Sequence, residues 1–260
     1  RLAVINQKGG VGKTTLVALL VCADRGFIAH VGDSRVYLLR KEQIHQLTED
    51  HSLVNELIRR GKLKPGQEVS LPYKNAVTRA VGVYPSVEVD TLDFDLLPGD
   101  RYLLCSDGLA GYLDAEPDDT AFGSMFSGQD LNQIPQVLID YSNAAGGKDN
   151  ITAVVIEALD DDAEDETLKS AEVQLKLDTL HAIPLFKYLT YKELVKLLNI
   201  THTEDHPVGG VIMEEGGAAL LDKWQRLARG REGIERRLRA RHDGVCGSFI
   251  LAWRLRCPMD

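Results

Sequence analysis

Three aspartates stand where predicted β-strands end or begin, and their carboxylates could bind a divalent metal ion. Asp33 and Asp107 each follow an apolar run that stops at a glycine or a serine, and Asp149 lies in a glycine-rich turn before another apolar run. Strand ends are rigid positions, and oxygen ligands gathered there suit hard cations such as Mg²⁺ and Mn²⁺. Aspartate is also a favoured turn residue, so each of the three taken alone is more simply explained as a turn former.

A glycine-rich loop near the start of the chain could bind phosphate. Its candidate nucleotide-binding residues are Lys8, Gly9, Gly10, Gly12, Lys13 and Thr14. Glycines let backbone N–H groups close on a phosphate, a lysine adds charge, and a threonine can hold Mg²⁺. The loop is similar to the variant loop of the ParA/MinD partitioning ATPases, which implies that ATP is the ligand and that Lys8 reaches a nucleotide across a dimer interface. Those ATPases continue into a helix, whereas residues 15–22 are apolar and β-branched and favour a strand.

The elements that must position the aspartates are mostly short strands. The predicted strands are residues 15–21, 27–31, 36–39, 87–94, 101–106 and 151–156, and the predicted helices are residues 51–60 and 131–144. A further apolar β-run precedes the glycine-rich loop. Many strands with few helices indicate an α+β domain rather than a regular βαβ repeat.

Five short blocks that include the aspartates occur in one order along this region. They are residues 32–35 (GDSR), 47–53 (LTEDHSL), 77–82 (VTRAVG), 97–109 (LPGD to SDGL) and 147–152 (GKDNIT). Their order and spacing resemble the bacterial metal-dependent protein phosphatases of type 2C, over about residues 14–157. The resemblance implies a two-layer antiparallel β-sandwich flanked by helices, with the metal ions held at one end between the sheets.

The resemblance also implies a role for each aspartate and a cofactor. Asp107 and Asp149 would ligate the metal centre, and Asp33 would share an additional, weaker site with Asp107. The residues expected to support the ligand loops are Ser34, Gly108 and Asn150. The cofactor would be Mn²⁺ or Mg²⁺, with two or three ions in the family. A metal-activated water would then hydrolyse phosphoserine and phosphothreonine in proteins by in-line attack on phosphorus.

Two blocks of that family do not occur in the sequence. The family has an arginine-containing segment that ends in Asn-Gln/Glu-Asp, and an Asp-Gly-x-Gly-Gly-His block whose aspartate bridges both metal ions. Asp24-Arg25-Gly26 is the nearest Asp-Gly neighbourhood, and it is predicted to be a hairpin turn between two β-runs. We therefore expect an incomplete sandwich with impaired turnover. The alternatives are a phosphatase-like scaffold without activity and a P-loop ATP-binding protein.

The remaining sequence suggests a plan of five segments. Residues 1–15 are P-loop-like, residues 14–158 phosphatase-like, residues 159–170 an acidic linker, residues 171–217 similar to the start of a cyclic-nucleotide-binding domain, and residues 218–260 a basic tail. Within the fourth segment, residues 175–181 and 191–198 are predicted helices around the loop 183–186. The phosphate-binding cassette of that family is not found in the sequence, so a helical appendage that packs on the phosphatase-like region is the preferred interpretation. The tail could contact a membrane surface or an acidic partner, or reflect a change of reading frame or an artificial join.

Charge and composition restrict the partners and the location. The net charge is −9, and residues 221–260 carry ten Lys and Arg against five Asp and Glu, so the first 220 residues carry −14. An acidic body argues against nucleic-acid binding, and the longest strongly apolar uncharged run, 14–23, is shorter than the ~20 residues of a membrane span. The cysteines form no C-x-x-C pair, which fits a reduced, cytoplasmic compartment. Phosphorylated proteins are the expected partners, with a Ser/Thr kinase and its substrates among them.

Overall fold

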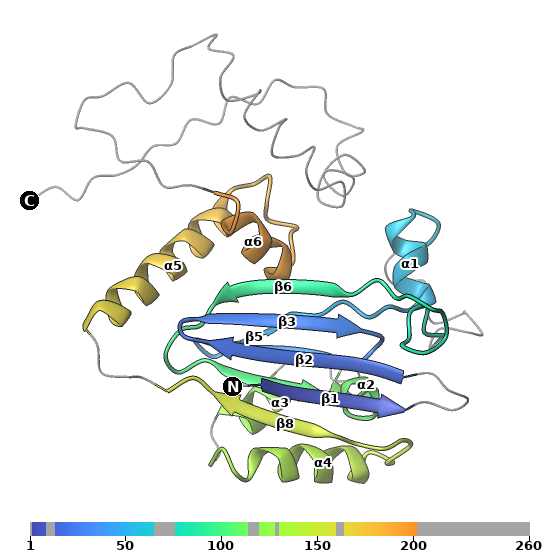
Figure 1. Ribbon diagram of the computed structural model, residues 1–260. Coiled ribbons are helices and arrows are strands. Elements are labelled where there is room, and N and C mark those ends of the chain that lie inside the picture. The colour runs from blue at the N-terminus through green and yellow to red at the C-terminus, as the bar shows by residue number, and fades with distance from the viewer. Residues whose placement is uncertain are drawn as a thin grey trace, which may run out of the picture. The chain divides into compact units, whose positions relative to one another are not determined.

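Two antiparallel sheets make up the centre of the molecule. The computed structural model describes residues 2–8, 14–64, 76–113, 120–127, 130–159 and 164–201, and residues up to Thr201 form one compact unit. The first sheet has the strand order β1-β2-β3-β6 and the second β5-β4-β7-β8 (Figure 1). The first contains β1 (Leu2–Lys8), β2 (Thr14–Cys22), β3 (Arg25–Val31) and β6 (Asp90–Asp95). The second contains β4 (Arg35–Arg40), β5 (Gln43–Gln46), β7 (Arg101–Cys105) and β8 (Ala153–Glu157).

Helices occupy the connections between strands and follow the last strand. They are α1 (Leu53–Arg59), α2 (Asp107–Leu113), α3 (Thr120–Ser127), α4 (Ile134–Ala144), α5 (Glu164–Ala182) and α6 (Tyr191–Leu198). None of the described helices is long and apolar enough to cross a membrane. Two antiparallel sheets with flanking helices confirm the predicted α+β class.

The main core lies between the two sheets. Along β2 the side chains alternate, so that Val17 and Leu19 are buried while Leu20 is exposed. Because successive side chains of a strand point to opposite faces, Val17 and Leu19 share the inner face. They join Tyr102 and Leu104 of β7 in one hydrophobic cluster. The strand was predicted from its apolar, β-branched residues, and its alternating burial shows that one face of this sheet is covered.

A second core lies on the other face of the β4-β7 pair. Leu103 and Cys105 of β7 point to this side and are fully buried. They pack with Leu109 of α2, Phe126 of α3 and Leu138 of α4. Within this core Cys105 acts as a small apolar residue.

Helices α5 and α6 also contribute side chains to the main core between the two sheets. Leu177, Phe186 and Leu194 belong to the same cluster as the residues between the sheets, and α6 contacts both β5 and β6, the edge strands on one side of the sandwich (Figure 1). The start of α6 is fixed by a capping box in which Thr190 and Glu193 exchange hydrogen bonds between side chain and backbone. The two helices predicted around the loop 183–186 are confirmed.

A buried charged network ties α6 to the second sheet. Arg40 of β4 donates hydrogen bonds to both carboxylate oxygens of Asp100, at 2.8 Å from Nε and 2.5 Å from Nη2. The Tyr102 hydroxyl donates to Asp100 at 2.7 Å, and Arg40 Nη1 donates to the Tyr191 hydroxyl at 2.8 Å. Arg40 and Asp100 are 6% and 2% exposed, so this pair has lost most of its hydration and depends on these partners.

His30 of β3 is a buried histidine that we expect to make folding sensitive to acid. Burial, followed by the nearby His51 and Lys192, lowers its pKa to about 3. The unfolded chain takes up a proton near pH 6.5 and the folded chain only near pH 3, so the free energy of unfolding falls as the pH drops through this window. Between pH 7.5 and pH 5, His30 alone should lower the free energy of unfolding by about 2 kcal/mol.

Urea unfolding of the wild type and of His30→Phe at pH 7.5 and pH 5 measures this effect. The variant should lose about 2 kcal/mol less than the wild type between the two pH values. Equal losses in the two proteins would show that His30 does not titrate in this way.

The structure corrects the prediction for five elements: β5, α1, α2, α3 and α5. Strand β5 and helices α2 and α3 were not predicted. Asp107 and Gly108 were expected in a tight turn after a strand, and they form the first turn of α2 instead. His51 was placed in a helix, but that helix begins at Leu53 after the N-cap Ser52. Finally, α5 begins at Glu164, inside the segment predicted as an acidic linker.

The structure gives no support to a nucleotide-binding loop. Thr14 begins β2, which runs antiparallel to β1 with Lys8 opposite Thr14. A phosphate-binding loop of this type needs a helix at its end, because the helix N-terminus supplies N–H groups to the phosphate. The resemblance to the ParA/MinD ATPases is therefore not confirmed. Its central residues, 9–13, lie outside the described residues, as do residues 202–217 of the predicted cyclic-nucleotide-binding-like segment and the tail 218–260.

Candidate metal centre

The turn that carries Asp33 connects the two sheets and is fixed against β2. Gly32 has a φ of +110°, and a Cβ atom at this position would lie 2.4 Å from Cβ and Cγ2 of Thr15. Only glycine fits this conformation and this close approach. Ser34 is fully buried, and its hydroxyl lies 3.2 Å from the Thr15 hydroxyl. The backbone on both sides of Asp33 is thus held by one residue of the neighbouring strand.

The Asp33 carboxyl is in an environment that disfavours its negative charge. Burial, followed by the charges of Asp107 and Asp50, raises its pKa to about 6. A like charge nearby raises the pKa of a carboxyl, and a bound cation would reverse that effect. The negative charge of Asp107, at the end of another strand, thus adds to the effect of burial on Asp33.

Asp107 has a buried oxygen that lacks a partner. Its Oδ1 atom is inaccessible to solvent and accepts no hydrogen bond from any described residue. A carboxylate oxygen buried without a partner is costly. A metal ion would supply the missing contact, so the donor set fits a hard cation with oxygen ligands.

The segment that carries Asp149 packs directly against the first turn of α2. A Cβ atom on Gly108 would lie 2.4 Å from the carbonyl oxygen of Asn150 and 3.5 Å from the carbonyl carbon of Asp149. The Ser106 hydroxyl, just before α2, donates to the same Asn150 oxygen at 3.1 Å. These contacts place the Asp149 segment beside Asp107, and Asn150 and Gly108 contribute to this through their backbones.

The side chain of Asp149, in contrast, is not enclosed by the protein. It is exposed, and its Oδ1 atom accepts a hydrogen bond of 2.7 Å from the N–H of Asn150. Within the described part of the chain, no three His, Cys, Asp or Glu side chains are placed so that they could hold one metal ion. The contacts of Gly108 and Ser106 thus place the Asp149 segment beside Asp107, and metal binding by Asp33, Asp107 and Asp149 stays a prediction.

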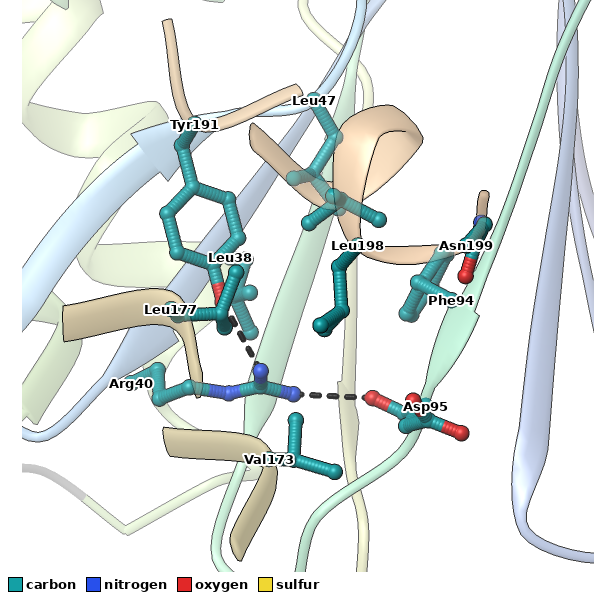
Figure 2. A pocket seen from close by; sticks show the side chains of 11 residues that line it. Leu38, Arg40, Leu47, Phe94, Asp95, Val173, Leu177, Tyr191, Leu198 and Asn199 are labelled. Atoms are coloured by element: carbon teal, nitrogen blue, oxygen red, sulfur yellow. Dashed lines mark hydrogen bonds between the residues drawn. The ribbon is translucent and has the colours of Figure 1, made fainter. Parts of the chain in front are cut away.

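A pocket lies elsewhere, between the sandwich and the last two helices. It is lined by Arg40, Tyr191 and apolar side chains from β4, β6, α5 and α6, and Figure 2 shows the Arg40 guanidinium extended between Tyr191 and Asp95. None of the predicted site residues lines it. This pocket therefore belongs to the packing of α5 and α6 and not to the metal centre.

Comparison with known proteins identifies the class to which this chain belongs. Residues 5–151, more than half of the chain, match the family model of protein phosphatase 2C. The chain belongs to the protein phosphatase 2C family.

Among the relatives, the Listeria welshimeri serine/threonine phosphatase stp is 43% identical over 148 residues, which cover 57% of each chain. Streptococcus pneumoniae protein phosphatase PhpP is 37% identical over 165 residues, covering 60% of this chain and 61% of the relative. The chain thus spans about three fifths of the length of these relatives.

Solved structures of the same class share the fold. The serine/threonine phosphatase of S. agalactiae is 37% identical with a TM-score of 0.52, over 56% of this chain and 60% of that one. The Mycobacterium tuberculosis phosphatase PstP/Ppp is 34% identical with a TM-score of 0.51, over 57% of this chain and 61% of that one.

Proposed function

We propose that the chain is a metal-dependent protein serine/threonine phosphatase whose metal centre is incomplete. The observation that carries the proposal is the buried, unpartnered Oδ1 atom of Asp107 beside Asp33, whose pKa is raised in part by Asp107. Two carboxyls in this arrangement lack a counter-charge, which Mn²⁺ or Mg²⁺ would provide. Membership of the protein phosphatase 2C family supports the same assignment.

The residues of the centre have separate tasks in this proposal. Asp107 holds the metal ion directly, and Asp33 contributes its carboxylate from the turn between β3 and β4. Asp149 is the third ligand, carried on the segment that packs against Gly108. Ser34 and Asn150 fix the two ligand loops through Thr15 and Ser106. The bound ions supply Lewis-acid activation of water for hydrolysis of a phosphate ester.

The substrates in this proposal are proteins phosphorylated on serine or threonine, with a Ser/Thr kinase acting on the same substrates. The compartment is the cytoplasm. Support for a reducing compartment comes from the spacing of the cysteines in the sequence, which form no C-x-x-C pair.

A phosphatase-like scaffold is the second candidate. It is favoured by the absence, among the described residues, of three clustered ligands, and by the lack of an Asp-Gly-x-Gly-Gly-His block in the sequence. Such a scaffold would bind a metal ion without turning over a phosphoprotein.

Asp107→Asn tests the metal centre, with Asp140→Asn, an exposed aspartate of α4, as the matched control. Mn²⁺ titration by calorimetry should show at least about a tenfold loss of affinity for Asp107→Asn and no change for Asp140→Asn. Hydrolysis of a phosphothreonine peptide with added Mn²⁺ separates the two candidates, because a scaffold binds Mn²⁺ but gives no phosphate release. Equal Mn²⁺ binding by the wild type and Asp107→Asn would contradict the metal site itself.

A further inference from the structure

The turn that carries Asp33 is held from a second direction by residues that follow β5. The His51 main-chain N–H donates to the Gly32 carbonyl oxygen at 2.8 Å, and the His51 ring Nδ1 atom accepts from the Gly32 N–H at 3.1 Å. His51 thus provides hydrogen-bond partners for both the N–H and the carbonyl group of Gly32. The His51 side chain is 7% exposed, so water does not compete for these contacts.

The residue next to His51 holds the other end of the same turn. Asp50 accepts two hydrogen bonds of 2.8 Å from Arg35, one from Nε and one from Nη2. A paired contact of this kind fixes the direction as well as the distance of a guanidinium group. Asp50 is itself held by Asn55 of α1, which donates to its carbonyl oxygen at 2.9 Å. The two neighbours of the Asp33-Ser34 pair, Gly32 and Arg35, are therefore anchored by two adjacent residues.

The ring of His51 has a defined orientation because its two nitrogens face different groups. Since Nδ1 accepts a hydrogen from an amide, the proton of the neutral ring is on Nε2. Nε2 lies 3.5 Å from Asp90 Oδ1 at the start of β6 and 3.4 Å from Arg79 Nη1, and of these two only the carboxylate can accept its proton. Asp90 is held in turn by Arg79 at 2.9 Å and by Lys192 of α6 at 3.6 Å. The carboxylate of Asp90 thus keeps the imidazole turned with Nδ1 towards Gly32.

We propose that His51, oriented by Asp90, and its neighbour Asp50 are positioning residues that hold the Asp33 carboxylate in place for metal binding. This inference rests on the proposed metal centre. His51 contacts no carboxylate of that centre and acts only through the backbone of Gly32. The positive φ of Gly32 is a conformation that an isolated turn adopts only as one among several, so hydrogen bonds from outside the turn are what select it.

Two substitutions of His51 each keep one of its two side-chain contacts and remove the other. His51→Asn puts an amide oxygen near the position of Nδ1, so it keeps the acceptor for Gly32 and loses the contact with Asp90. His51→Gln puts an amide group near the position of Nε2, so it keeps the contact with Asp90 and loses the acceptor for Gly32. Both variants lose one hydrogen bond and some ring packing, so urea unfolding should show similar losses of stability in the two.

The first measurement is Mn²⁺ titration of the full chain by calorimetry. We expect the Mn²⁺ affinity of His51→Asn to stay within about threefold of the wild type, and that of His51→Gln to fall by at least about tenfold, as for other residues that orient metal ligands. Equal affinities of the two variants would overturn the positioning role while leaving the proposed function intact.

The second measurement needs no metal ion. Amide hydrogen exchange of Gly32 should be at least about tenfold faster in His51→Gln than in His51→Asn, because only the asparagine can accept from this N–H. Equal protection in the two variants would also overturn the proposal. If instead the wild type and Asp107→Asn fail alike to bind Mn²⁺, the proposed function fails, and the exchange result still decides whether His51 holds the turn.

Discussion

Replacing Arg40 with leucine should destabilise the fold by about 3–5 kcal/mol. The substitution leaves the Asp100 carboxylate, which is 2% exposed, with the Tyr102 hydroxyl and the Leu97 N–H as its remaining hydrogen-bond donors. It also removes the donor to the Tyr191 hydroxyl, which fastens α6 to the second sheet. The free energy of unfolding in urea measures the loss.

An exposed ion pair is the control for this prediction. Glu56 of α1 pairs with Arg59 and Arg60, whose side chains are 48% and 60% exposed. Glu56→Gln should therefore change the free energy of unfolding by less than about 1 kcal/mol. The double variant Arg40→Leu with Asp100→Asn should recover part of the loss, since it no longer buries an unpaired charge. A loss for Arg40→Leu as small as that for Glu56→Gln would show that the buried network contributes little.

Two glycines of α2 should respond in opposite directions to the same substitution. Gly108→Ala places a methyl group 2.4 Å from the Asn150 carbonyl oxygen, and because that atom is backbone it cannot rotate away. We expect a loss of about 1–3 kcal/mol from overpacking. The same methyl group pushes the Asp149 segment away from Asp107, so the Mn²⁺ affinity should fall as well.

Gly111→Ala is the matched control on the same helix. A Cβ atom at Gly111 meets no atom within 4 Å, so alanine should stabilise the helix by about 0.5–1 kcal/mol through its lower backbone entropy cost. Its Mn²⁺ affinity should equal that of the wild type. Stability changes of the same sign in the two variants would contradict the close approach between α2 and the Asp149 segment.

The sheet-forming parts of the sequence could be predicted because they are rich in apolar and β-branched residues. Residues 15–21 form most of β2, in which Val17 and Leu19 are buried, and the start of α6 follows from Thr190 and Glu193, whose spacing is that of a capping box. Strand β5 was missed because Gln43–Gln46 is polar at three of its four positions. Helix α2 was missed because Gly108 and Gly111 weaken its pattern, and tertiary packing against β7 compensates for them.

The candidate site was predicted in its residues and only partly in its geometry. Asp33 and Asp107 both follow strands of the same sandwich, and the Asp107 charge helps to raise the pKa of Asp33, while their role as metal ligands stays a prediction. The orientation of the Asp149 carboxylate depends on a hydrogen bond to its own neighbour, which no spacing reveals. Asp50 and His51 stood in one of the five blocks without a role, since their function depends on contacts with residues that precede them by 15 and 19 positions.

The glycine-rich loop near the start of the chain shows that the pairing of neighbouring strands can decide the structure against a strong local motif. The residues around the loop have the composition of a phosphate-binding site, but β2 pairs with β1 over residues 14–20 and with β3 over residues 16–22. Because Thr14 is part of β2, it cannot begin the helix that the motif requires. The β-branched residues after the loop are the signal that distinguishes the two outcomes.

The shared interior of the sandwich and helices α5 and α6 has a consequence for how the chain melts. Val173, Leu180 and Val195 are packed in the same apolar interior as Ile28 and Leu92 of the first sheet, so neither part retains a complete interior when the other separates. Two domains that fold independently give two calorimetric transitions. Parts of a chain that share one hydrophobic core unfold together. Residues up to Thr201 should accordingly give a single calorimetric transition.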